Sequence, residues 1–373
     1  MANLDLQGNI QIQRQPLSVL SVRPFALQTL LLKRTPEQIV QFVALAYSLC
    51  GHAQKTAAQL VLNPQNADSI KSQNKYPVIV ESLKEHYLSL LQLLNQLQLI
   101  SPQQAAQAMQ GVGQWVSTTV SLAATTPEPD LTQLANQIQQ SFLKLGLCLS
   151  SVKTPYTDDS PFHSLNQYFA KDHYQNTLST LGSLHAHPKS MSQWAPPQEA
   201  WNQWLQAPTL DNQPLENSAW TRVQQQQNTP LNLAQTQTLA QLLQQRLEAK
   251  ILDAAWWWQQ LQPEYTETKI FFIEQKAQQR FAWVETARGR LMHWAQCDAK
   301  GQTQAYAICA PTEWNFHPQG LMKQALAALP QDLDDNSWQQ TATLIAQLID
   351  PCVPLKFQSH LPETNLSKEA RYA

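Results

Sequence analysis

Two cysteines in this chain stand where an ordered thiol could take part in metal chemistry. Cys50 lies in the run Leu49-Cys50-Gly51-His52, and Cys352 directly follows Asp350-Pro351. Each cysteine is expected at the end of a helix, because glycine and proline both interrupt helical structure. A thiolate held there suits a soft metal ion, whereas a buried, inert thiol is the alternative reading of either residue alone.

The segment before Cys352 is expected to form a hairpin that has an arginine at its start and a threonine after its end. Residues 281–310 predict a β-hairpin, since the polar stretch 297–302 forms the turn and the flanking residues alternate as half-buried strands do. Arg288 lies at the start of this hairpin, and Pro311-Thr312 follows its end. A helix with a cap at Asn336 or Ser337 should then run to Asp350-Pro351.

The order of these motifs resembles a known family. Glu285-x-x-Arg-Gly-x-Leu-x-His-Trp, Pro311-Thr-x-Trp-Asn and Asp350-Pro-Cys, together with Leu49-Cys-Gly, are similar to the large subunit of nickel-iron hydrogenases. In that family the corresponding cysteines ligate the metal centre. The resemblance therefore implies that Cys50 and Cys352 meet at one metal site.

The sequence also departs from the family at positions that carry its catalysis. Ala53 and Leu355 stand where the family has the two cysteines that bridge nickel and iron, so one iron and no nickel are expected. Gln7 occupies the position of a glutamate implicated in proton transfer. Ala26 and Gln358 replace residues that hold an outer metal ion. The chain is therefore not expected to be an enzyme that turns over hydrogen.

The residues that surround iron in the family are retained. The resemblance implies that Arg288 and Thr312, the latter after Pro311, donate hydrogen bonds to cyanide ligands on iron. An iron dicyanide carbonyl unit is anionic, so a guanidinium and a hydroxyl are suitable donors. His52 is a further candidate, either as a ligand or as a hydrogen-bond donor. The alternatives are a surface arginine, a turn threonine and a structural histidine.

Among relatives, the pattern is most similar to the large-subunit-like accessory proteins of hydrogenase maturation, of the HupK or HoxV type. This resemblance implies a non-catalytic scaffold that transiently holds an Fe(CN)2(CO) unit. Its partners would be the maturation proteins that deliver the unit and the hydrogenase large subunit precursor that receives it. Two alternatives are an active or residual nickel-iron hydrogenase-type oxidoreductase, in which His52 compensates for a lost ligand, and a metal-free interaction subunit of the same fold.

Composition limits the remaining classes of function. Only 14% of the 373 residues are charged and the net charge is −2, so no basic surface for nucleic acid is expected. No apolar run reaches the ~20 residues of a membrane span, and no signal peptide is visible. These features predict a cytoplasmic location, where the five cysteines would stay reduced.

The predicted fold class is mainly α with a minor β portion. A single large-subunit-like domain is expected over 1–373, with an irregular insertion rich in Trp and Pro over 150–230. Thr35 should cap a helix that is buried on all sides as far as Cys50. The Leu-rich run 83–100 and residues 239–261 predict further helices of a buried bundle, and small strands are expected near the N-terminus.

Overall fold

The protein is represented by a computed structural model of the 373-residue chain. It describes residues 8–22, 30–32, 34–125, 131–151, 155–179, 181–184, 201–227, 236–262, 265, 269–298 and 301–358. Helices dominate this part of the chain and strands form small sheets, which confirms the predicted fold class.

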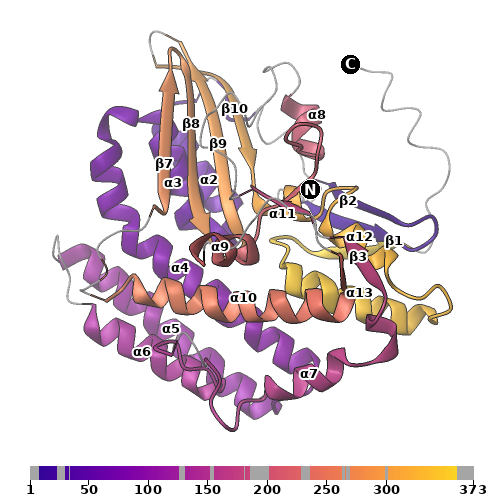
Figure 1. The fold of residues 1–373 in the computed structure, drawn as a ribbon. Coiled ribbons are helices and arrows are strands. Elements are labelled where there is room, and N and C mark those ends of the chain that lie inside the picture. Colours follow the sequence, from indigo (N-terminus) through magenta and orange to yellow (C-terminus); the bar gives the residue numbers. More distant parts are fainter. Residues whose placement is uncertain are drawn as a thin grey trace, which may run out of the picture.

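Two long helices form the centre of the molecule. Helix α4 (Ala67–Gln96) packs against α10 (Leu239–Gln259), and α5 (Pro102–Thr125) and α6 (Thr132–Lys144) cover α4 from outside (Figure 1). Both central helices bury leucines together with charged side chains. Apolar burial stabilises this bundle, while the charges it encloses require partners inside the protein.

The predicted hairpin is part of a larger antiparallel sheet. Its strands β7, β8, β9 and β10 are hydrogen-bonded in sequence order, so the sheet begins well before residue 281. Their bounds are Phe271–Lys276, Gln279–Thr286, Gly289–Cys297 and Thr303–Cys309. Helix α3 (Gly51–Leu62) packs on β8 and β9, and thus the segment after Cys50 lies on this sheet.

A second sheet joins the two ends of the described chain. Strand β1 (Asn9–Gln13) pairs with β2 (Ser18–Val22) in antiparallel orientation and with β11 (Leu355–Gln358) in parallel orientation. The Ile10 N–H also binds the Pro354 carbonyl at 2.9 Å. Because β11 begins shortly after Cys352, this pairing anchors the loop that carries that thiol.

Two local predictions were wrong. Helix α2 (Pro36–Ala46) begins with the expected Thr35 capping box, but it is not buried on all sides, since Leu45 is 81% exposed. A separate 3-10 turn, Ser48–Cys50, precedes α3. Helix α13 (Asp335–Ile349) is capped by Asp334, whose carboxylate binds the Ser337 N–H, and not by Asn336 or Ser337.

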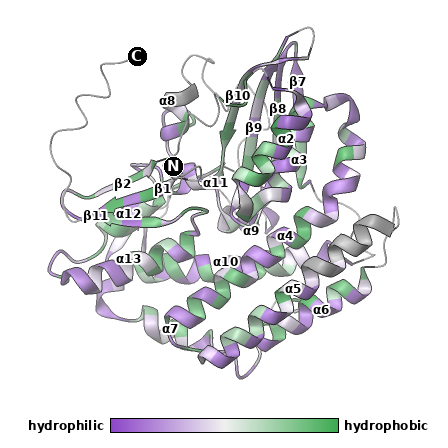
Figure 2. Cartoon of the chain, turned by 180° about the vertical axis from the view of Figure 1, so that it is seen from behind, coloured by the Kyte–Doolittle hydropathy of each residue, from purple (hydrophilic) through white to green (hydrophobic). Residues whose placement is uncertain are grey.

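The distribution of polar and apolar residues in helix α13 is typical of a helix that lies on the surface of the core. Hydrophobic and hydrophilic residues alternate along it in Figure 2, and Trp338, Ala342 and Ile345 are buried as their spacing predicted. The helix ends at Asp350, whose positive φ of 67° forms a left-handed cap before Pro351.

The described parts of the 150–230 insertion contain more regular structure than expected. They include α7 (His163–Phe169), α8 (Trp201–Gln206) and α9 (Ala219–Gln226), with short strands between them. The Trp204 ring lies edge-on against Trp294 and Trp314, which confirms that this tryptophan packs onto the protein. Gln7 and Ala26 lie outside the described residues.

No helix in the described ranges combines the length and the apolar character that a membrane crossing requires.

Candidate metal centre

The backbone around Cys50 is held by a carboxylate from the central bundle. Cys50 precedes the first turn of α3, and the Glu81 carboxylate of α4 accepts the backbone N–H groups of His52 at 2.8 Å and Ala53 at 2.9 Å. An anion at a helix N-terminus satisfies donors that have no partner within the helix. Glu81 therefore fixes the turn that presents the Cys50 thiol.

Cys352 is held by the threonine of the Pro-Thr motif. The Thr312 hydroxyl donates to the Cys352 sulfur at 3.0 Å and accepts the Cys352 backbone N–H at 3.2 Å. Thr312 is buried in the short helix α11 (Pro311–Asn315), which begins with Pro311 directly after β10. Thus the predicted hairpin delivers Thr312 to Cys352 from forty positions away in the sequence.

The two thiols lie close enough for Cys352 to influence the ionisation of Cys50. Burial raises the pKa of Cys50, and the neighbouring Cys352 and Glu81 raise it further, while Arg288 opposes them. Both cysteines are half-buried, and neither forms a disulfide. Two remote segments of the chain therefore place two reduced sulfurs at one location.

Arg288 stands between this thiol pair and two carboxylates. Its guanidinium lies 3.0 Å from Glu85 on α4 and 3.3 Å from Asp350 at the end of α13. Burial alone would lower the pKa of Arg288, but Asp350, Glu85 and the two thiols raise it above its ordinary value. Arg288 is therefore a fixed positive charge beside both sulfurs.

A lysine completes the charged side of the site. The Lys250 ammonium of α10 lies 2.6 Å from the second carboxylate oxygen of Asp350 and donates to the Ser89 hydroxyl at 3.1 Å. Burial would raise the pKa of Asp350, yet Arg288 and Lys250 hold it below its ordinary value. Asp350 is thereby kept ionised between two cations.

The glycine after Arg288 is required by a close approach from the insertion. Gly289 has a φ of +127°, and a side chain there would meet the Asn217 carbonyl oxygen at 2.3 Å. The Asn217 amide also accepts the Arg290 N–H at 2.7 Å and donates to the Arg290 carbonyl at 2.8 Å. Asn217 therefore supports the turn that carries Arg288.

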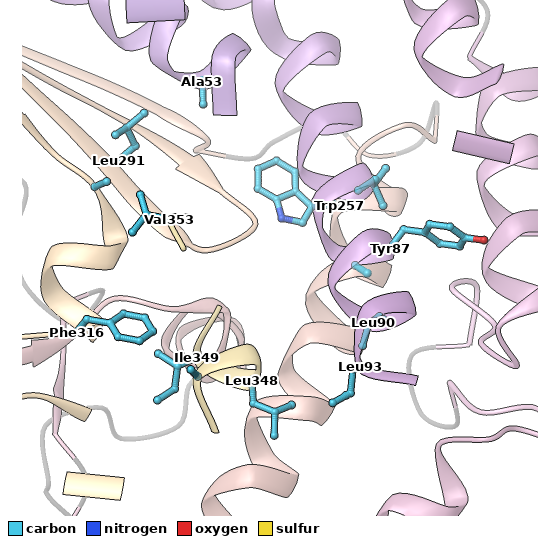
Figure 3. Close-up of a cluster of buried hydrophobic side chains, with 14 of the residues drawn as sticks. Ala53, Tyr87, Leu90, Leu93, Trp257, Leu291, Phe316, Leu348, Ile349 and Val353 are labelled. Atoms are coloured by element: carbon cyan, nitrogen blue, oxygen red, sulfur yellow. The ribbon is translucent and has the colours of Figure 1, made fainter. Parts of the chain in front are cut away.

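Both cysteines pack against the large apolar core. Ala53 of α3, Leu291 of β9 and Val353 after Cys352 are buried and are drawn together in Figure 3. Ala53 occupies the position of a bridging cysteine in the resembling family, and it contributes only a methyl group. Leu355, at the second such position, pairs with Ile10 as the first residue of β11.

The structure brings together the side chains of four of the six predicted site residues, and a fifth belongs to the helix that presents one of them. Cys50, Cys352, Arg288 and Thr312 surround one location, and Pro311 starts the helix that presents Thr312. The His52 side chain is exposed, and its contact here is a backbone N–H. Among the described residues, no three side chains of His, Cys, Asp or Glu are grouped as metal ligands.

Several residues of this site were not found from the sequence. They share a buried charge or amide and come from four different elements: Gln54, Glu81, Glu85, Asn217 and Lys250. One signal was available. Glu81 lies just before the Leu-rich run and Glu85 lies within it, and their spacing of four residues places both carboxylates on one face of a helix.

Comparisons with known proteins show which sequences and folds this chain is similar to. No family profile matches the chain. It is 46% identical over 70 residues to the hydrogenase expression/formation protein HupK of Rhizobium leguminosarum bv. viciae, with 19% of each chain covered. It is 41% identical over 92 residues to the hydrogenase expression/formation protein HoxV of Cupriavidus necator, covering 23% of this chain and 24% of that one. The matched stretches thus span less than a quarter of these relatives.

Similarity to solved structures extends over nearly the whole chain. An NAD+-reducing [NiFe]-hydrogenase chain matches with a TM-score of 0.55 at 11% identity, covering 94% of this chain and 96% of that one. The Ni-Fe-Se hydrogenase from D. vulgaris Hildenborough matches with a TM-score of 0.57 at 14% identity, covering 94% and 97%. The chain therefore has the fold of a nickel-iron hydrogenase large subunit and is similar in sequence to hydrogenase expression/formation proteins of the HupK and HoxV type.

Proposed function

We propose that this chain is a non-catalytic accessory protein of nickel-iron hydrogenase maturation. It transiently holds an Fe(CN)2(CO) unit between Cys50 and Cys352 and passes it to the hydrogenase large subunit. The observation that carries this proposal is the convergence of the Cys50 and Cys352 thiols, neither of which is in a disulfide, with Arg288 and Thr312. The names of the relatives, hydrogenase expression/formation proteins, support a role in maturation.

The residues present fit such a unit. Thiolates are soft ligands for iron, and an iron that brings three small ligands of its own needs few protein donors. Two sulfurs without a third grouped ligand among the described residues suit that requirement. The Arg288 guanidinium and the Thr312 hydroxyl supply donors for anionic cyanide nitrogens.

The same residues favour release of the iron unit. With Ala53 and Leu355 in place of two cysteines, the chain offers two sulfurs rather than four. Burial raises the pKa of Cys50, so a proton competes with a metal for that sulfur. The Thr312 hydroxyl already donates to the Cys352 sulfur and can stabilise it when the unit leaves. These features give a site that binds the unit and can also give it up.

The proposed partners are the maturation proteins that deliver the iron unit and the large subunit precursor that accepts it. The fold supports a relation to the large subunit, because this chain has the fold of a hydrogenase large subunit. A carrier with that fold can present its ligands to the unit in an arrangement related to that of the recipient.

Infrared spectroscopy tests the proposal. The protein is purified without oxygen after co-expression with the maturation proteins, and its metal content is measured on the same sample. Carbonyl and cyanide stretching bands with iron and without stoichiometric nickel are expected, and Cys50→Ala or Cys352→Ala should remove them. Cys148→Ala is the matched control, because that cysteine lies on another part of the bundle next to Ser150.

Other outcomes identify the alternatives. A protein that carries no iron unit in any such preparation would be a metal-free interaction subunit of the same fold. Stoichiometric nickel together with hydrogen-dependent dye reduction would instead establish an oxidoreductase. Either result would contradict the carrier proposal.

A further inference from the structure

An uncharged chain of hydrogen bonds ends at the Cys50 sulfur. The Tyr306 hydroxyl lies 2.7 Å from Nδ1 of His293, and Nε2 of His293 lies 2.9 Å from Oε1 of Gln54. The Gln54 amide nitrogen lies 3.8 Å from the Cys50 sulfur. All three side chains are buried, and they connect the sheet to the first turns of α3.

The chain has a defined direction. Burial lowers the pKa of His293 to about 3 and raises that of Tyr306, so the imidazole is neutral and the phenol keeps its proton. A neutral imidazole has one N–H. When its Nε2–H donates to the Gln54 carbonyl oxygen, its Nδ1 accepts the Tyr306 O–H. The Gln54 NH2 group then faces the sulfur, and every donor in the chain is directed towards Cys50.

Local geometry places Gln54 for this contact. It follows Cys50 by four residues, which is the spacing of neighbours on one face of a helix. Its side chain has no exposed surface, and His293 holds its carbonyl end. Aligned donors of this kind polarise one another, so the bond nearest the sulfur is strengthened by the bonds behind it.

We propose that Gln54, oriented by His293 and Tyr306, is a positioning residue that directs the Cys50 sulfur and limits how strongly it donates electrons to a bound metal. This inference rests on the proposed function for its biological meaning. An N–H bond to a thiolate draws charge from the sulfur, as contacts to ligand atoms in other metal sites do. A sulfur restrained in this way can hold an iron unit and still release it.

Cobalt(II) binding to the purified protein, without any iron unit, tests the proposal. Cobalt held by thiolates gives a sulfur-to-metal charge-transfer band, which Cys50→Ala should strongly reduce. Gln54→Leu should shift the band to lower energy, because a sulfur that accepts no N–H bond loses an electron more readily. Tyr306→Phe should shift it in the same direction by a smaller amount.

The chain offers a matched control. The Gln139 amide nitrogen also lies 3.8 Å from a cysteine sulfur, that of Cys148, so Gln139→Leu removes the same kind of contact elsewhere. This variant should leave the band unchanged. If Gln54→Leu does not fold, Gln54→Met and Tyr306→Phe provide the same measurement with smaller changes.

Each result has a clear meaning. A band that depends on Cys50 but does not move in the Gln54 or Tyr306 variants would overturn the proposal, as would a wild-type protein without any thiolate band. If the cobalt charge-transfer band shifts as expected in the Gln54 and Tyr306 variants, but no carbonyl or cyanide bands appear after co-expression, the proposed function is contradicted. The role of Gln54 is then still supported.

Discussion

The two thiols lie in contrasting surroundings. Cys352 is next to Thr312 and a set of buried ions, in which Arg288 and Lys250 hold Asp350 between them. Cys50 is held by a neutral amide and by a helix turn fixed through backbone N–H groups. We call the Cys352 side the charged half of the site. The Cys50 side, which also lies near Glu81 and Arg288, is contacted by the neutral Gln54 amide, and we call it the neutral half.

This difference teaches how a site can attract an anionic unit without excessive affinity. Fixed cations provide a favourable field, and the low dielectric of the interior makes it effective. Neutral donors, by contrast, adjust one sulfur without adding net charge. Substitutions in each half should therefore have different effects on stability and on metal binding.

Removal of the Lys250 ammonium group, in the charged half, should lower the free energy of unfolding most. Lys250→Met keeps the length of the side chain but leaves the buried Asp350 with Arg288 as its cation. Loss of one member of a buried ion pair typically destabilises a protein by about 3–5 kcal/mol. Urea unfolding monitored by circular dichroism measures this change.

The control for that variant is an exposed ion pair. Lys276 lies 3.4 Å from Glu274 and is 56% exposed. Because water screens such pairs, Lys276→Met should cost less than about 0.5 kcal/mol. Equal effects of the two variants would show that the buried ions near Asp350 do not support the fold.

In the neutral half, the contribution of His293 to stability should decrease at acidic pH. The pKa of His293 is about 3 in the folded protein and about 6.5 when unfolded, so folding disfavours its protonation. Its contribution to stability is complete above the unfolded pKa and is lost as the pH falls towards 3. Between pH 7 and 5, the stability of the wild type relative to His293→Gln should therefore decrease by about 2 kcal/mol.

The comparison with His293→Gln is necessary because Glu81 acts in the opposite direction. Burial raises the pKa of Glu81 to about 7, so its contribution is present at low pH and is lost as the pH rises through 7. Both proteins contain Glu81, and the difference isolates His293. Parallel pH profiles of the two proteins would contradict the neutral, buried imidazole.

The smallest change in stability is expected at Thr312, which contacts Cys352 and would contact the proposed iron unit. Thr312→Val removes a hydroxyl that donates to the Cys352 sulfur and accepts its N–H, which should cost about 1 kcal/mol. In the proposed loaded protein, the cyanide bands should also move. Thr343→Val, in the exposed part of α13, is the control and should change neither quantity.

Part of this site could be predicted from the sequence and part could not. The motif order brought Cys50, Cys352, Arg288 and Thr312 together as a resemblance, and the geometry agrees. Lys250 was missed because its pairing with Asp350 depends on how α10 packs against α13, which no local pattern specifies.

Two further differences between the sequence-based predictions and the structure also have physical causes. The cap of α13 was misplaced because Asp334, Asp335, Asn336 and Ser337 are all competent N-cap residues, and only the path of the preceding chain selects Asp334. Asn217 was missed because it lies in an insertion with weak periodicity. Its role follows from contact with Gly289, a residue far away in sequence.

The central claim is that both sulfurs bind one iron. X-ray absorption at the iron edge, on the anaerobic co-expressed protein, counts the sulfur neighbours of that iron directly. The account predicts two sulfurs per iron in the wild type, and a loss of iron or of one sulfur neighbour in Cys50→Ala and in Cys352→Ala. Iron that has no sulfur neighbours, or whose sulfur neighbours are unchanged in both variants, would contradict it.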